Sequence, residues 1–141
     1  MIGLIMSAHG QYASGLKTGL DLVVGSSENI KVLDFAGDEI DKYRQDFETL
    51  IKEMLEKYDS LAIATDIAGG TPYNTAVMLT SDNAKVSVFS GLNFQLAYEL
   101  SNMENNLDEN NEKSIEVARE GISYFKIEND ADTSFEGGIE N

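Results

Sequence analysis

Hydrophobic positions along the chain follow two patterns that alternate with one another. Four short runs are almost entirely apolar, which is typical of strands buried on both faces of a parallel sheet. Between them, apolar residues recur every three or four positions, as they do along one face of a helix. The predicted strands are residues 2–8, 30–35, 61–65 and 85–90, and the predicted helices are residues 11–24, 39–58, 72–79, 93–103 and 113–125.

Residues with special backbone preferences predict where several of these elements begin. Asp38 is a candidate N-cap for the second helix, whose apolar stripe over residues 40–58 is the most regular in the chain. Thr71 is a candidate N-cap for the third helix, because Pro72 then occupies the first helical position, which proline favours. The polar segment 105–111 is expected to be a loop.

The alternation of strands and helices predicts one α/β domain with three layers, in which helices cover both faces of a central, mainly parallel sheet. Ligands of such sheets bind at the carboxyl ends of the strands. His9, Asp66 and Gly91 each follow close after a predicted strand. If the first and third strands are neighbours, their ends lie about 5 Å apart, so the His9 imidazole and the Asp66 carboxylate are expected to be in contact.

Composition narrows the range of functions. The chain has 25 acidic and 10 basic residues and a net charge of −15. This charge argues against binding to nucleic acid or to an anionic membrane surface; it favours a basic protein partner, and simple solubility explains it equally well. With no cysteine and one histidine, the chain is not expected to form disulfides or to bind a metal. The chain lacks an apolar run of about 18 residues and a basic secretory start, so a cytoplasmic protein fits best.

His9 is the only histidine, and imidazole is the side chain best suited to nucleophilic chemistry near neutral pH. We expect Asp66 to accept a hydrogen bond from Nδ1–H of His9, which fixes the tautomer and leaves Nε2 as the nucleophile. The pair therefore predicts a histidine that carries a phosphoryl group. The simpler alternatives are that Asp66 caps a turn and that His9 is an ordinary surface residue.

The turn after the third strand has the features of an anion site. The N–H groups of Gly69, Gly70 and Thr71 stand at the start of a helix, where unpaired amides and the helix dipole attract anions. Together with Gly10, these residues are the candidate phosphoryl-binding groups, although the turn alone is equally an ordinary strand-to-helix connection. The chain contains no Gly-x-Ser-x-Gly elbow, Walker loop or Gly-x-Gly-x-x-Gly motif, which disfavours a hydrolase or a nucleotide-binding protein.

Three segments carry a resemblance to a known family. They are residues 7–10 (Ser-Ala-His-Gly), residues 66–74 (Asp-Ile-Ala-Gly-Gly-Thr-Pro-Tyr-Asn) and residues 91–94 (Gly-Leu-Asn-Phe). Together they resemble the IIA component of the mannose-type sugar phosphotransferase system (PTS), over the first 125 residues. The chain departs from the family at Gln95, where the family often has proline, and at Thr71, where serine is common and the hydroxyl is kept.

The resemblance implies a sheet in the order 2-1-3-4, with His9 phosphorylated on Nε2 and Asp66 as its partner. It implies that phosphorylated HPr donates the group, that a IIB component accepts it, that the membrane components IIC and IID are reached only through IIB, and that no cofactor takes part. It also implies a homodimer in which an antiparallel strand from about residues 124–129 is exchanged. Residues 1–128 would then form the phosphoryl-carrier domain, and residues 129–141 an acidic tail.

Two other functions stay open at this point. One is the histidine subunit of a PTS-dependent dihydroxyacetone kinase, which shares the fold. The other is a non-catalytic regulatory module that keeps the anion-binding turn without transferring a group. The sugar is not identified by these motifs, because a IIA component contacts protein partners and the phosphoryl group.

Overall fold

The computed structural model describes residues 2–103 and 107–128. Within these ranges the strands are β1 (Ile2–His9), β2 (Ile30–Phe35), β3 (Ser60–Thr65) and β4 (Val86–Phe89). The helices are α1 (Tyr12–Val24), α2 (Ile40–Lys57), α3 (Thr71–Thr80), α4 (Phe94–Ser101) and α5 (Leu107–Glu120). The predicted acidic tail at residues 129–141 lies outside the described residues.

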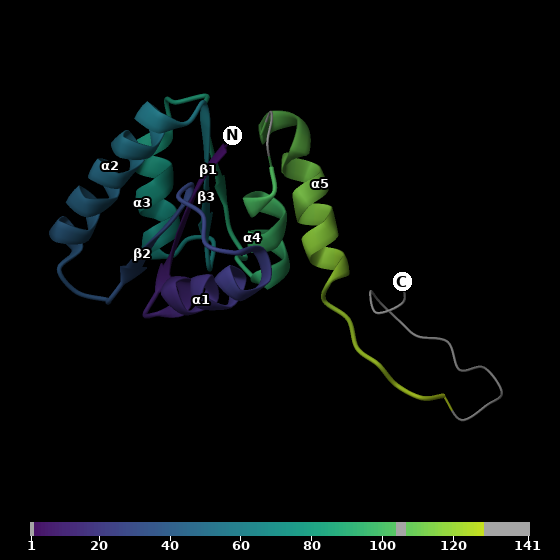
Figure 1. The fold of residues 1–141 in the computed structure, drawn as a ribbon. Helices are drawn as coiled ribbons and strands as arrows, with labels where there is room; N and C mark the ends of the chain where they lie inside the picture. Colours follow the sequence, from purple (N-terminus) through teal and green to yellow (C-terminus); the bar gives the residue numbers. More distant parts are fainter. Residues whose placement is uncertain (1, 104–106, 129–141) are drawn as a thin grey trace.

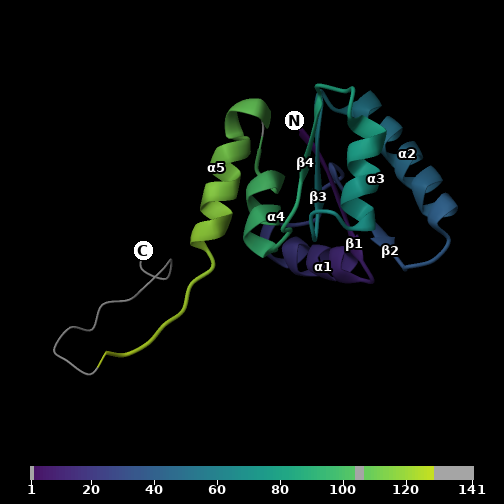
Figure 2. The same cartoon turned by 180° about the vertical axis from the view of Figure 1, so that it is seen from behind.

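The four strands form one parallel sheet in the order β2-β1-β3-β4, which confirms the predicted α/β fold and strand order. Helices α2 and α3 cover one face of the sheet, and α1 and α4 cover the other, with α5 packed outside α4 (Figures 1 and 2). Because β1 and β3 are the central pair, the residues that follow them meet at one edge of the sheet. This arrangement positions the candidate site.

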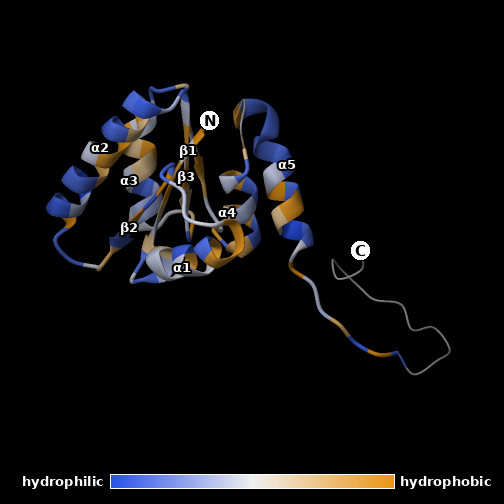
Figure 3. Ribbon diagram, viewed as in Figure 1, coloured by the Kyte–Doolittle hydropathy of each residue, from blue (hydrophilic) through white to orange (hydrophobic). Residues whose placement is uncertain are grey.

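Side chains of β1 alternate between the two cores, as a strand with a period of two requires. Leu4 and Met6 belong to the core beneath α1 and α4, whereas Ile5 packs with Phe47 and Met54 of α2. The strands are predominantly hydrophobic, and the outer turns of α2 and α5 are hydrophilic (Figure 3). The continuous apolar runs in the sequence therefore reflect burial on both faces of the sheet.

The start of α5 corrects one prediction. The helix begins at Leu107, so the expected loop is wrong over residues 107–111. The buried face of α5 includes Leu107, Ser114 and Ala118. Because this face contains polar residues, the hydrophobic spacing typical of a helix is not visible in the first part of α5. The helix also ends at Glu120, before the predicted end, and residues 122–128 leave it as an extended segment that points away from the body of the molecule (Figure 1).

Both predicted N-caps are wrong by one residue. Glu39, not Asp38, precedes α2; it has a left-handed backbone (φ 49°), and among the described residues no side chain caps this helix end. Gly70 precedes α3, so Thr71 and Pro72 occupy the first two helical positions. Proline is accepted there because its missing N–H is not needed in the first turn.

Candidate functional site

The candidate site lies at the carboxyl ends of the two central strands. His9 is the last residue of β1, and Asp66 follows β3 directly. Nδ1 of His9 lies 2.8 Å from Oδ2 of Asp66, and the backbone N–H of His9 donates to the same oxygen over 3.0 Å. The side chain of His9 is 49% exposed and that of Asp66 is 20% exposed. The structure thus joins the two residues that the sequence pattern singles out and leaves the imidazole accessible to a partner.

The charge of Asp66 decides which nitrogen of the imidazole carries the proton. Burial favours the neutral carboxyl, but hydrogen bonds from the backbone and ring of His9 outweigh it, so the pKa of Asp66 lies below its ordinary value. Its other oxygen accepts the backbone N–H of Ile67 over 3.0 Å. An ionised carboxylate only accepts hydrogen bonds, so Nδ1 of His9 is the donor. The neutral ring then carries its lone pair on Nε2.

Gly70 lies against the edge of the imidazole. A Cβ atom at this position would be 2.9 Å from Cε1 of His9 and 2.9 Å from Cγ2 of Ile67. Its φ of −76° is open to any residue, so the close approach, and not the backbone conformation, is what requires glycine here. Cε1 lies between the two ring nitrogens, so this edge of the imidazole faces the residue that precedes α3.

The backbone amides around the ring fall into two groups. The N–H of Gly70 donates to the carbonyl oxygen three residues earlier over 3.1 Å, and the N–H of Gly10 donates to that of Phe35 over 2.7 Å. These two predicted phosphoryl-binding amides are therefore engaged in turn hydrogen bonds. Among the described residues, the N–H groups of Gly69 and Thr71 have no acceptor. They lie at the N-terminus of α3, where an anion is favoured.

Two residues that support the site were not singled out by the sequence pattern. Asn74 donates from Nδ2 to the carbonyl oxygen of Gly69 over 3.0 Å and so ties the first turn of α3 to the glycine turn. The ring of Phe35 meets the imidazole of His9 in a T-shaped contact, with centroids 5.6 Å apart. Asn74 belongs to the segment 66–74, and Phe35 ends a predicted strand at the same sheet edge. These positions are the features of the sequence that could have indicated a role for the two residues at the site.

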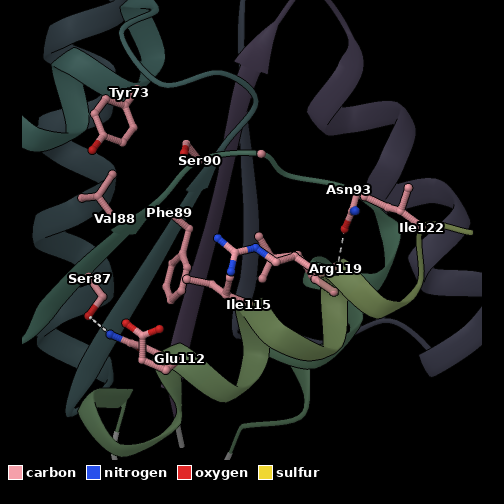
Figure 4. Close-up of a pocket in the computed structure, with 14 residues that line it drawn as sticks. Tyr73, Ser87, Val88, Phe89, Ser90, Asn93, Glu112, Ile115, Arg119 and Ile122 are labelled. Carbon is pink, nitrogen blue, oxygen red and sulfur yellow. Dashed lines mark hydrogen bonds between the residues drawn. The ribbon is translucent and has the colours of Figure 1, made fainter.

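A separate cavity lies beside β4, one of the two edge strands of the sheet. Its volume is about 430 Å³, and it is walled by β4 on one side and α5 on the other (Figure 4). The lining residues labelled in Figure 4 are Tyr73, Ser87, Val88, Phe89, Ser90, Asn93, Glu112, Ile115, Arg119 and Ile122. The guanidinium of Arg119 extends into the cavity between the two walls (Figure 4).

Two kinds of feature are absent from the part of the chain that the structure describes, a grouped set of metal ligands and a membrane-spanning helix. In residues 2–103 and 107–128, no three His, Asp or Glu side chains are grouped as a metal ion requires. Over the same part of the chain, no helix has both the length and the apolar character needed to cross a bilayer.

An α/β domain with an exposed histidine, held by a carboxylate beside a helix N-terminus, is suited to carrying a phosphoryl group covalently. The chain belongs to the EIIA-man family, described as the PTS system fructose IIA component, whose family model matches residues 3–116. It is therefore an EIIA phosphoryl carrier, a phosphotransferase component that serves sugar transport, and its partners belong to the PTS.

Named relatives agree with this assignment. The chain is 28% identical over 139 residues to the PTS system fructose-specific EIIA component of Bacillus subtilis, covering 92% of this chain and 94% of that one. It is 27% identical to the mannose-specific EIIAB component of Escherichia coli, of which it spans 40%. The crystal structure of an EIIA component from Streptococcus agalactiae has a TM-score of 0.75 and 28% identity, covering 88% of this chain and 97% of that one.

Proposed function

We propose that His9 is the residue that carries the phosphoryl group, through its Nε2 atom. The observation that supports this proposal is the 2.8 Å contact between Nδ1 of His9 and Oδ2 of Asp66, which leaves Nε2 as the free nucleophile. In the transfer, the Nε2 lone pair forms a bond to phosphorus while the bond from phosphorus to the donor breaks and its electron pair leaves with the donor. The reverse sequence passes the group to the acceptor.

Asp66 has two roles in this proposal. It holds the ring in one orientation through the hydrogen bonds to the backbone and ring of His9. It also stabilises the positive charge that the ring gains when Nε2 bonds to phosphorus while Nδ1 keeps its proton. Both effects favour transfer without requiring Asp66 to take up the proton.

The N-terminus of α3 is the proposed binding site for the phosphoryl oxygens. The N–H groups of Gly69 and Thr71 supply donors, and the hydroxyl of Thr71 adds another. Gly70 contributes by its lack of a side chain, and Gly10 by turning the chain after β1 with a positive φ of 59°. Neutral donors hold the group without the strong attraction of a lysine, which suits a group that must leave again.

Phosphorylated HPr as donor and a IIB component as acceptor complete the proposal, together with a cytoplasmic location in which membrane components are reached through IIB. The exposed apolar side chains of Tyr12 and Ile67 near His9 offer a contact surface for such proteins. The hydroxyl of Tyr12 donates to the carbonyl oxygen of Leu92 and so fixes this side chain beside the site.

The test is phosphorylation with phosphoenolpyruvate, enzyme I and HPr. The wild-type chain should gain one acid-labile phosphoryl group, and His9→Ala should gain none. Asp66→Asn should keep the fold and slow transfer roughly 100-fold or more, because the ring loses both its fixed tautomer and the charge that stabilises it. A phosphoryl group that persists in His9→Ala would reject the assignment of His9, and an unchanged rate in Asp66→Asn would remove Asp66 from the mechanism.

The edge of β4 supports the expected exchange of a strand between two copies. Beside it lies the cavity of about 430 Å³, and residues 124–128, the described part of the expected strand, are extended with exposed apolar side chains such as Tyr124 (68%) and Ile127 (68%). We propose that this segment of a second copy pairs with β4 and fills the cavity, because an edge strand offers unpaired N–H and C=O groups.

Sedimentation tests the dimer. The full chain should sediment as a dimer, and a variant ending at residue 121 as a monomer. A variant ending at residue 128 is the matched control, because it removes only the acidic tail, and it should stay dimeric. A full chain that is monomeric at high concentration would contradict strand exchange.

A further inference from the structure

A row of aromatic rings leads from α2 to the imidazole of His9. The ring of Phe35 lies 5.6 Å from the imidazole, at an interplanar angle of 73°. On its other side, Phe35 lies 4.8 Å from the ring of Tyr43, and Tyr43 lies 5.6 Å from that of Phe47. His9 is thus the exposed end of a buried aromatic cluster.

The inner part of this row is held firmly. Phe35 is 5% exposed and Tyr43 is 6% exposed. The hydroxyl of Ser7 donates to the carbonyl oxygen of Leu33, so its single proton is used and the Tyr43 hydroxyl is the donor in the 2.5 Å contact with Ser7. Burial raises the pKa of Tyr43 to about 12, which keeps this hydroxyl protonated.

The backbone of Phe35 also acts on the segment that follows His9. Phe35 pairs with His9 in the register of β1 and β2, and its carbonyl oxygen accepts the N–H of Gly10 over 2.7 Å. One residue of β2 therefore contacts both the imidazole and the turn that leads into α1.

The imidazole needs such a contact. Rotation about the terminal torsion of histidine is broad, and half of the His9 side chain faces solvent, so burial does not fix the ring. The hydrogen bond to Asp66 restrains one point of the ring, at Nδ1. Gly70 leaves room at Cε1 and does not press on the ring with a side chain. Phe35 supplies the second restraint.

We propose that Phe35 is a positioning residue for phosphoryl transfer, which holds the imidazole of His9 at the angle at which Nε2 meets the incoming phosphorus. The inference rests on the proposed function of His9. An error of about 1 Å in the placement of a reacting group can slow a reaction roughly 100-fold. Loss of the Phe35 ring should therefore slow transfer without weakening partner binding, because Phe35 is buried and lies beneath the contact surface.

The experiment compares Phe35→Leu with Phe47→Leu. Both replace a buried ring of the same aromatic cluster with the same smaller side chain, but Phe47 has no ring contact with His9. Transfer from phosphorylated HPr is measured under conditions in which each variant is folded. For Phe35→Leu we expect kcat to fall about 10-fold with KM unchanged, and ¹⁵N spectra of the imidazole should show a smaller share of the Nδ1–H tautomer. Phe47→Leu should resemble the wild type in all three measurements.

The outcomes separate the inference from the function on which it rests. Equal kcat values and equal ¹⁵N spectra for the two leucine variants would overturn the role of Phe35, while His9→Ala in the same assay would still show whether His9 is the phosphorylated residue. A rise in KM with kcat unchanged would also overturn the role, because it would place Phe35 in partner binding. If Phe35→Leu does not fold, Phe35→Met provides a flexible side chain of similar size, and the same expectations apply.

Discussion

At the scale of single residues, the site depends on how one imidazole is restrained. The carboxylate of Asp66 holds Nδ1, the ring of Phe35 packs against the imidazole, and Gly70, which has no Cβ, leaves room at Cε1. The ring stays half-exposed, and Nε2 is the atom that we propose to react. This combination suits the proposed function, in which the imidazole of His9 meets a donor and an acceptor protein in one orientation.

The pKa of Asp66 reports directly on its contact with the imidazole. Burial raises this pKa, and the hydrogen bonds from His9 lower it further than burial raises it. We expect ¹³C titration of the carboxyl to give a midpoint below the ordinary value of about 3.9 in the wild type, and a higher midpoint in His9→Ala, which loses the hydrogen bond from the ring. Gly15→Ala, on α1 with nothing but its own neighbouring helix backbone within 4 Å of the added Cβ, is the control and should leave the midpoint unchanged.

The lowered pKa of Asp66 also predicts how the stability of the fold depends on pH. Because the folded-state pKa of Asp66 is lowered, the carboxylate stabilises the fold above about pH 4, and this contribution is lost as the pH falls through the folded-state pKa. His9→Ala should therefore flatten the loss of stability in acid, as measured by urea unfolding between neutral and acidic pH. An equal acid dependence in both proteins would contradict the coupling.

Gly70→Ala tests the closeness of the glycine turn to the ring. The added Cβ would lie 2.9 Å from Cε1 of His9, so the ring must move, although the backbone at φ −76° tolerates alanine. We expect the phosphorylation rate to fall about 10-fold with little change in thermal stability. Gly15→Ala is again the matched control, since it adds the same methyl group in open space. An unchanged rate in Gly70→Ala would show that the ring adjusts without cost.

The sequence pattern predicts the pairing of His9 with Asp66 because the ends of adjacent parallel strands must meet. It does not predict which amides remain free, because the hydrogen bonds of Gly10 and Gly70 depend on turn conformations that many sequences share. The contact with Phe35 required the register of β2 against β1 and a side-chain rotamer, neither of which leaves a trace in hydrophobic periodicity.

At the scale of elements, α1 and α3 are the helices that follow the two central strands, and of these two only α3 has a first turn open to an anion. The first turn of α1 is occupied by Asp34 of β2, whose carboxylate accepts the N–H and the hydroxyl of Ser14 over 3.1 Å and 2.6 Å. The first turn of α3 has no carboxylate bound to it among the described residues. The phosphoryl group is therefore expected at α3, since Asp34 already neutralises the positive end of α1.

Asp34→Ala tests whether the anion site belongs to the start of α1 or to the start of α3. Loss of the capping interaction should lower the free energy of unfolding by about 1 kcal/mol, as measured by urea denaturation. Ser14→Ala removes the side-chain part of the same interaction and should cause a loss of similar or smaller size. The phosphorylation rate of the folded protein should stay near that of the wild type in both variants. A large drop in rate with Ser14→Ala would contradict the assignment of the anion site to α3.

The predictability of the elements follows from what each one buries. The strands were predicted closely because residues buried on both faces are almost all apolar. The start of α5 was not predicted, because the polar residues Asn111 and Ser114 line the inner side of this helix. There, Nδ2 of Asn111 donates a hydrogen bond to the hydroxyl of Ser87. The predicted starts of α2 and α3 are wrong by one residue. The residues that precede these helices are Glu39, with a left-handed backbone, and Gly70, and neither caps the helix with its side chain as the pattern suggests.

At the scale of the whole molecule, the large negative charge of the chain contrasts with the mostly neutral groups of the proposed phosphoryl site. The net charge is −15, yet the proposed phosphoryl site is built from neutral amides and a hydroxyl around a single carboxylate. The excess of acid therefore acts at long range and not on the reacting group. Such a field accelerates the approach of a basic partner and is screened by salt.

Added salt should consequently slow the encounter with a basic partner and leave the rate of the chemical step unchanged. Raising the ionic strength from about 0.01 M to about 0.1 M shortens the Debye length from about 30 Å to about 10 Å, which removes most of the long-range attraction. For transfer from phosphorylated HPr, we expect kcat/KM to fall several-fold over this range while kcat stays constant, because the Asp66–His9 contact is a direct hydrogen bond and not a long-range interaction. A variant ending at residue 128, which lacks the acidic tail, should show a shallower salt dependence in the same stopped-flow measurement. A kcat/KM that rises with salt would mean that the partner presents an acidic surface and that the negative charge of this chain slows the encounter.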